Sequence, residues 1–256
     1  MILRRLVASL RGQNWTSVAI ELGIVILGVF IGIEAANWNQ ARQERQETRQ
    51  LLSQLEPELV TYQGFFDELN AGIIEDAGLK LACGAGCSIC CSLRVDVFAH
   101  EVFLIARHVQ TQFSREELSG LLARLAIHSA EVLPLTPFDH ATRNVVCPLL
   151  VDHRCSVYAV RGHSCRRHHS QDLAACQYTY DHPTDLDFPA AHDRDLFRTL
   201  SEAMQHGIDG YAQLGFDNTI YELGTALAEA LDTPASWERW RAKGKAFLRA
   251  SVTPAA

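Results

Sequence analysis

The residues of this chain most able to do chemistry are its cysteines. The chain has eight of them: Cys83, Cys87, Cys90, Cys91, Cys147, Cys155, Cys165 and Cys176. The first four crowd into one short stretch that also holds Gly84 and Gly86. Thiolates at C-x2-C spacing converge on one metal ion because a tight turn points both sulfurs inward, and glycine lets the backbone fold that closely. All eight cysteines are therefore candidate metal ligands.

A disulfide framework is the alternative that an even cysteine count leaves open. Adjacent Cys90 and Cys91 argue against it: we expect their side chains to diverge, whereas a bridge needs Cα atoms about 4.4–6.8 Å apart with matched Cβ directions. The chain is also long enough to bury a core without covalent staples. Scattered buried cysteines would not cluster in this way, so a metal site is the preferred interpretation.

The cysteine pattern resembles that of the YkgJ-type cysteine-cluster proteins, a zinc- or iron-chelating family. The resemblance covers about residues 80 to 180. It rests on Cys83-x3-Cys87-x2-Cys90-Cys91, on Cys147-Pro148-Leu149-Leu150, and on the stretch from Cys155 through Arg161 and Gly162 to Cys165-Arg166. The family usually has two residues in the first gap, where this chain has three. It also usually has proline after the arginine, where this chain has Gly162.

The resemblance implies zinc or iron as cofactor, with an iron–sulfur cluster as one form of the iron. Eight thiols exceed the needs of one tetrahedral zinc, so two sites, a binuclear site or a cluster with spare ligands all stay open. If one site exists, the positions that match the family's motif best supply it: Cys87, Cys90, Cys91, Cys147, Cys155 and Cys165.

Charged and imidazole side chains lie near these cysteines in the sequence. Four arginines could offset the negative charge of a thiolate site or donate hydrogen bonds to sulfur: Arg154, Arg161, Arg166 and Arg167. Three histidines could replace a cysteine as ligand: His163, His168 and His169. Asp96 and Glu101 could add oxygen ligands. A basic loop that faces water is the competing interpretation of the arginines.

The pattern is also similar to that of lysine-N-methylases that modify flagellin, which implies an iron–sulfur-dependent modifying enzyme as an alternative. No residue stands out as catalytic, and no Gly-rich strand–loop–helix for a nucleotide-like cofactor is found. A disulfide-stapled exported domain with an interaction role is the third hypothesis. A net charge of −7 excludes the basic footprint of a nucleic-acid-binding protein.

An apolar stretch from Thr16 to Ala36 precedes the cysteines. Its uncharged centre, Leu22 to Ile33, gives about 18 Å of helix, and tryptophans flank it at Trp15 and Trp38, as interfacial anchors do. We expect an uncleaved single-pass anchor, similar to short N-terminal anchors of bacterial inner-membrane proteins; a buried core helix is the alternative. Arginines are balanced on the two sides, so the side of the membrane that holds the cysteines stays unresolved.

Beyond the anchor we expect a helical stalk with an a/d seam: Leu52, Leu55, Leu59, Tyr62, Phe66 and Leu69. A helix packed on its own domain is slightly preferred over a coiled-coil homodimer. Gly28 and Gly32 would let two membrane helices approach closely, so the membrane helix is a second candidate surface for a homodimer. Pro57 predicts a break or kink near Glu56.

The expected fold class is mainly α with a small β-hairpin, in a cysteine-rich domain organised by metal and preceded by a transmembrane helix and a stalk. Helices are predicted over Ala99–Gln110, from the Ser114–Glu117 capping box to Val132, and over Asp193–His206, Thr219–Leu231 and Pro234–Ala250. The hairpin joins Val145–Val151 to Cys155–Val160. The predicted domains are 1–38 (tail and anchor), 39–78 (stalk), 79–182 (cysteine cluster) and 183–256 (C-terminal helices).

Overall fold

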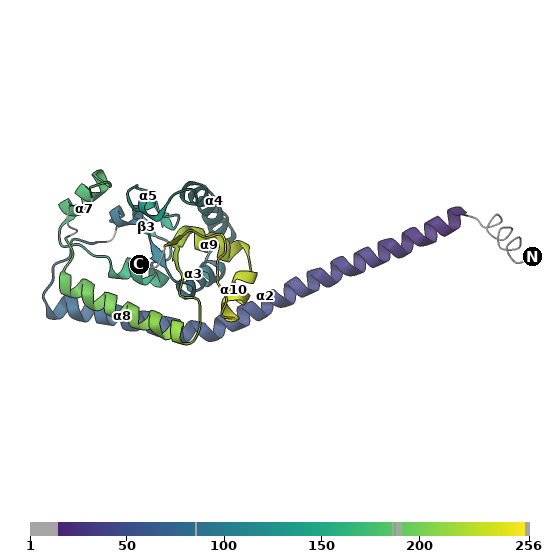
Figure 1. Ribbon diagram of the computed structural model, residues 1–256, viewed down its shortest axis with the longest axis horizontal. Helices are drawn as coiled ribbons and strands as arrows, with labels where there is room; N and C mark the ends of the chain where they lie inside the picture. Colours follow the sequence, from purple (N-terminus) through teal and green to yellow (C-terminus); the bar gives the residue numbers. More distant parts are fainter. Residues whose placement is uncertain (1–14, 85, 186, 188–190, 254–256) are drawn as a thin grey trace, which may run out of the picture. The chain divides into compact units, whose positions relative to one another are not determined.

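The computed structural model describes residues 15–84, 86–185, 187 and 191–253, and it is mainly helical, as expected (Figure 1). Side chains of residues 15–19, 21, 41 and 44–63 lie outside this description. The chain divides into two units, 1–50 and 51–256, and each is described by itself. The predicted four-part division stays a prediction.

Helix α2 (Trp15–Asp76) carries the apolar stretch of the first unit. Its segment Leu22–Gln40 is long and apolar enough to cross a membrane, although a signal sequence would share those properties. The apolar side chains of this segment are more than half exposed, which argues against a buried core helix. Trp38 is exposed as well, and the Arg42 guanidinium lies 5.3 Å from the centre of its ring. The other predicted anchor, Trp15, has its side chain outside the described residues.

Of the break or kink predicted near Glu56, the break is wrong, because α2 continues as a helix through Pro57 to Asp76; the kink stays a prediction. Proline removes a single N–H donor and crowds one carbonyl of the preceding turn, and the remaining hydrogen bonds keep the helix intact. Of the predicted a/d seam, only Phe66 and Leu69 have described side chains. Phe66 is fully buried against Leu196 and Leu200 of α8 (Arg194–Gln213), so here the helix packs on its own domain.

Three helices form the core of the second unit: α3 (Ala99–Gln112), α4 (Arg115–Val132) and α9 (Leu223–Asp232). Figure 1 shows α9 beside both α3 and α4, and α9 packs on each of them. The capping box that predicted α4 is present: Ser114 Oγ accepts from the Glu117 amide, and the Glu117 carboxylate accepts from the Ser114 amide. The helices at 99 and 115 are confirmed.

The predicted hairpin is confirmed in a shorter form, as β2 (Leu150–Val151) paired with β3 (Arg154–Cys155). Its turn residues Asp152 and His153 have φ of 47° and 60°, the backbone of a two-residue hairpin loop. The sequence did not predict a second, antiparallel sheet of β1 (Asp96–Val97), β4 (Ile220–Glu222) and β5 (Val252–Thr253). This sheet joins the segment that follows the first four cysteines to the C-terminal segment of the chain.

The C-terminal helices differ from expectation at their ends. Helix α8 extends beyond the predicted end, to Gln213, and the first residues of the next predicted helix form β4 instead. The last helix, α10 (Ala235–Arg241), stops well before Ala250, because the chain turns at Lys243 with a φ of 62°. Trp237, Trp240 and Phe247 belong to the buried core, as predicted. The remaining elements are η1 (Ile89–Ser92), α5 (Pro137–Ala141), η2 (Tyr158–Val160), α6 (His163–Arg167) and α7 (Leu173–Asp181).

One contact in this core admits only glycine. A Cβ at Gly224 in α9 would lie 2.3 Å from Cδ2 of buried His128 in α4. We expect Gly224→Ala to destabilise the fold by about 1–3 kcal/mol, the cost of overpacking a filled core. The matched control is Gly210→Ala in α8, where a Cβ would meet nothing within 4 Å and better helix propensity is expected to stabilise by up to about 1 kcal/mol. Urea unfolding followed by tryptophan fluorescence measures both; equal midpoints would show that the Gly224 contact carries no constraint.

Candidate metal centre

Four separate elements bring an inner group of cysteines together: Cys91, Cys147, Cys155 and Cys165. Cys91 lies in η1, and its carbonyl accepts a hydrogen bond of 2.7 Å from the Cys147 amide. Cys155 lies on β3 and is paired with Leu150, three residues after Cys147. Cys165 lies in α6. The hairpin therefore brings Cys147 and Cys155 close to each other.

Burial shapes the acidity of this inner group. The pKa of the Cys147 and Cys165 thiols is raised to about 12, mainly by burial and to a smaller extent by the charge of neighbouring Cys155. Burial also raises the pKa of Cys155. Without a cation these thiols stay protonated at neutral pH. A bound metal ion would reverse this preference, because thiolate rather than thiol is the metal ligand.

The outer group consists of three exposed cysteines, Cys83, Cys87 and Cys90, and of Cys176, which is half-buried like the inner four. Cys83 and Cys87 lie on the Gly-rich loop, where Gly86 has a φ of +88° that favours glycine. Burial raises the pKa of Cys83, with smaller contributions from the charges of Cys90, Cys176 and Cys87. Cys176 comes from α7, which packs on η1. Cys83 is therefore close enough to the other three thiols of this group for their charges to act on it.

The neighbours Cys90 and Cys91 link the two groups. The expectation that their side chains diverge is wrong: a hydrogen bond joins their thiols and raises the pKa of Cys90 well above its ordinary value. The tight 3-10 turn of η1 is the reason, since it bends the chain more sharply than an extended backbone would. All eight cysteines are nevertheless free thiols.

The sulfurs are near one another without forming a closed tetrahedron. Zn–S bonds of about 2.3 Å place the sulfurs of a tetrahedral site about 3.8 Å apart. Among the described residues no three cysteine sulfurs all lie within 4.8 Å of one another. The thiol set fits a metal by chemistry and convergence, and the ligands must draw together to bind it, as is usual for sites that form with their metal.

Of the four arginines suggested by the sequence, Arg161 alone has its charge directed at the thiols. It lowers the pKa of Cys90, Cys155 and Cys165, against the stronger effect of burial on the last two. Its guanidinium lies 4.0 Å from the centre of the Tyr158 ring. Its buried Nε has no hydrogen-bond partner in the described part of the chain. Arg161 is therefore placed to offset thiolate charge.

The other arginines have different roles. Arg166 is buried, pairs with Asp67 and donates to the carbonyls of Ala159 and Arg161, which holds α6 on α2. Arg167 donates a hydrogen bond to Ser201 and lies over the ring of Phe197, and both of these residues belong to α8. Arg154 is exposed in the hairpin. These three serve the fold or face water.

Glu101, predicted as an oxygen ligand, is a buried carboxylate that the structure engages in hydrogen bonds. With His100 and His163 it forms a group whose ligand atoms lie within 4.8 Å of one another. Its oxygens, however, already accept hydrogen bonds from the Phe98 amide, the His163 amide and His163 Nδ1, at 2.7–2.9 Å. Burial alone would raise the pKa of this carboxyl, but the hydrogen bond and charge of His163 outweigh it and lower the pKa to about 2.

The second predicted oxygen ligand, Asp96, is also engaged. It pairs with Arg94 at 2.9 Å and accepts from Thr253. Of the predicted histidines, His163 binds Glu101, and His169 accepts from the Asp193 amide through Nε2 and contacts the Arg167 carbonyl through Nδ1. Both ring nitrogens of His169 are therefore engaged, which argues against His169 as a metal ligand.

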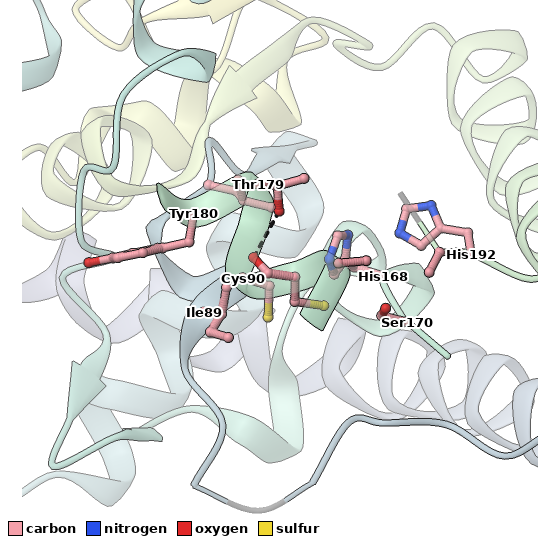
Figure 2. A pocket seen from close by; sticks show the side chains of 11 residues that line it. Ile89, Cys90, His168, Ser170, Thr179, Tyr180 and His192 are labelled. Atoms are coloured by element: carbon pink, nitrogen blue, oxygen red, sulfur yellow. Dashed lines mark hydrogen bonds between the residues drawn. The ribbon is translucent and has the colours of Figure 1, made fainter. Parts of the chain in front are cut away.

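His168 lines a cavity of about 160 Å³ beside the outer group, together with Cys90 and Cys176 (Figure 2). The sequence analysis missed His192, which lines the same cavity with its ring 4.9 Å from that of His168. Burial lowers the pKa of His168 to about 4 and also lowers that of His192, so both imidazoles are uncharged at neutral pH. No local motif marks His192, because only the tertiary fold brings it to the cysteines.

No family model, curated protein or solved structure matches this chain. The resemblance to the YkgJ-type proteins therefore stays a prediction that rests on the quoted motifs.

The buried carboxylate can be tested against an exposed one at the same helix position. Glu101 and Glu117 both cap their helices from the third residue. Breaking a buried, hydrogen-bonded pair costs roughly 3–5 kcal/mol, so we expect a loss of that order for Glu101→Gln and a small effect for exposed Glu117→Gln. Equal losses in urea unfolding would contradict the structural role of Glu101.

The low pKa of Glu101 also makes the stability of the fold depend on pH. Because the pKa of Glu101 is about 2 when folded and about 4.3 in an unfolded chain, its stabilisation is complete above about pH 4.5 and is lost as the pH falls towards 2. We expect the unfolding midpoint of the wild-type chain to fall over this window, and to fall less steeply in Glu101→Gln. Parallel slopes would show that Glu101 does not titrate in this way.

Proposed function

We propose that this chain is a membrane-anchored metal-binding protein whose cysteines hold zinc or iron, the iron either as an ion or in an iron–sulfur cluster. The observation that carries the proposal is the inner group. Cys147 and Cys165 lie close enough to Cys155 for its charge to act on them, a backbone hydrogen bond joins Cys91 to Cys147, and all four are free thiols. The residues that would hold the metal are Cys91, Cys147, Cys155 and Cys165, with Cys90 adjacent.

Charge supports this assignment. Four thiolates around a divalent ion carry a net charge of about −2, which is costly in a half-buried site. Arg161 supplies a cation beside Cys90, Cys155 and Cys165 and has an Nε free to donate. In the absence of metal, the raised thiol pKa values keep the group neutral, so metal binding would release protons.

The segment Leu22–Gln40 supports a location in a membrane. We propose the bacterial inner membrane, crossed once, on the resemblance of this segment to short anchors in such proteins. The side that holds the cysteines is undecided, although reduced thiols favour the cytoplasm. A homodimer through the membrane helix or the stalk belongs to the same proposal, and no nucleic-acid partner is proposed.

The resemblance to the YkgJ-type family supports zinc or iron, and Gly162 explains one departure from its pattern. A Cβ at this position would lie 3.0 Å from Glu101 Oε1 and 3.1 Å from Val97. Glycine, in place of the usual proline, allows this close approach in the present chain. The departure therefore reflects packing against α3 and leaves the cysteine spacing after it unchanged.

Elemental analysis and a visible spectrum test the proposal. We expect the full chain, extracted in detergent and purified without oxygen, to contain zinc or iron, and Cys147→Ser to lose much of it. The matched control is Ser156→Ala, which removes a hydroxyl from the same hairpin without touching a thiol. Iron with labile sulfide would favour the modifying-enzyme alternative. A metal-free protein with paired thiols would overturn the proposal in favour of a disulfide-stapled domain.

The position of Arg161 beside the thiols predicts that it affects metal affinity. Neighbours that tune a metal site typically change its affinity by 10–100-fold, so we expect Arg161→Gln to weaken metal binding by roughly that factor. Arg154→Gln, an exposed arginine of the same hairpin region, should leave affinity unchanged. Competition with a chromophoric chelator measures both variants. Equal affinities would show that Arg161 does not stabilise the thiolates.

A further inference from the structure

The cavity beside the outer group has two kinds of soft metal donor on its walls. Cys90 and Cys176 contribute thiols, and His168 and His192 contribute imidazoles. They come from η1, α7, the end of α6 and the segment before α8. Figure 2 shows the rings of His168 and His192 beside each other, with Cys90 next to His168. The inner group has four cysteines of its own, so it does not need His168 or His192 as a metal ligand.

Packing fixes His192 at the cavity while leaving its Nε2 without a partner. The ring stacks on Phe197 with centroids 5.1 Å apart and planes 6° from parallel. Its Nε2 is buried and has no hydrogen-bond partner in the described part of the chain. A buried nitrogen lone pair or N–H without a partner costs free energy, and a ligand in the cavity would satisfy it.

Hydrogen bonds hold the two histidine-bearing segments together. His169 accepts from the Asp193 amide at 2.9 Å, and the Gln171 amide donates to the Ala191 carbonyl at 2.8 Å. These bonds join residues 169–171 to 191–193, so that His168 and His192 stay adjacent. The fold thus brings two imidazoles close together beside two thiols that are distant in sequence.

We propose that Cys90, Cys176, His168 and His192 form a second metal site, for a zinc-class d10 cation, distinct from the inner group. This inference rests on the proposed function, because it assigns the outer thiols to a metal of their own. Two thiolates, two neutral imidazoles and one divalent ion sum to zero charge, which suits a largely apolar wall formed by Ile89, Leu93 and Ala175. Binding releases two thiol protons and changes no oxidation state.

The exposure of the outer group gives the second site a different character from the inner one. Cys90 is exposed and the cavity opens to solvent, whereas Cys147 and Cys165 are largely covered. Among the described residues no three of these donor atoms lie within 4.8 Å of one another, so α7 and the His192 segment must close on the ion. We expect faster metal exchange at this site.

Cobalt(II) titration of the full, reduced, metal-free chain in detergent tests the site, because cobalt reports thiolate and imidazole ligands in its visible spectrum. We expect two binding events in the wild-type chain. The variants His168→Phe and His192→Phe keep an aromatic ring in place and remove the nitrogen donors. We expect each to weaken one event at least about tenfold and to leave the other unchanged. The control is His182→Phe, which removes a histidine stacked on Tyr178 outside the cavity.

The outcomes separate this inference from the proposed function. Loss of one event in the histidine variants, and of the other in Cys147→Ser, supports both. Unchanged titrations in both histidine variants, with Cys147→Ser still defective, would overturn the second site and leave the proposed function standing. No cobalt or zinc binding by the wild-type chain would overturn both. Circular dichroism of each variant checks that it is folded.

Discussion

The buried carboxylate of Glu101 is the constraint on which the cysteine site depends. It caps α3 through the Phe98 amide and binds both the amide and the ring of His163. This places the start of α6, and therefore Cys165, against the core helix. A carboxylate in this position is stable only when its hydrogen bonds are made, and its low pKa reflects them. The close approach of Gly162 to the same oxygen shows how tightly the two segments pack.

The inner and outer cysteine groups differ in the charges that surround them. The inner group is covered, and Arg161 lies beside it, so it suits a site that carries net negative charge when loaded. The outer group is mostly exposed and faces uncharged imidazoles, so it suits a neutral site. The adjacent pair Cys90 and Cys91 joins the two, and a ligand change at one thiol would be felt at the other through their hydrogen bond.

Local signals predicted the parts of the fold that local interactions build. The Ser114 capping box marked the start of α4, and the hairpin turn at Asp152 marked the meeting of Cys147 with Cys155. The sheet of β1, β4 and β5 escaped prediction because its strands are two or three residues long, too short for a periodic pattern, and because β1 and β4 pair across more than 120 residues. His192 escaped for the same reason: its role depends on a tertiary contact. The helix break predicted at Pro57 is absent because the loss of a single hydrogen bond did not end a long helix.

X-ray absorption at the zinc edge, on the full chain loaded with one equivalent of zinc, tests the central claim most directly. The account predicts that the inner group fills first, with a ligand shell dominated by sulfur at about 2.3 Å. A shell dominated by nitrogen or oxygen at about 2.0–2.2 Å would contradict it, because the metal would then be bound elsewhere than at Cys91, Cys147, Cys155 and Cys165.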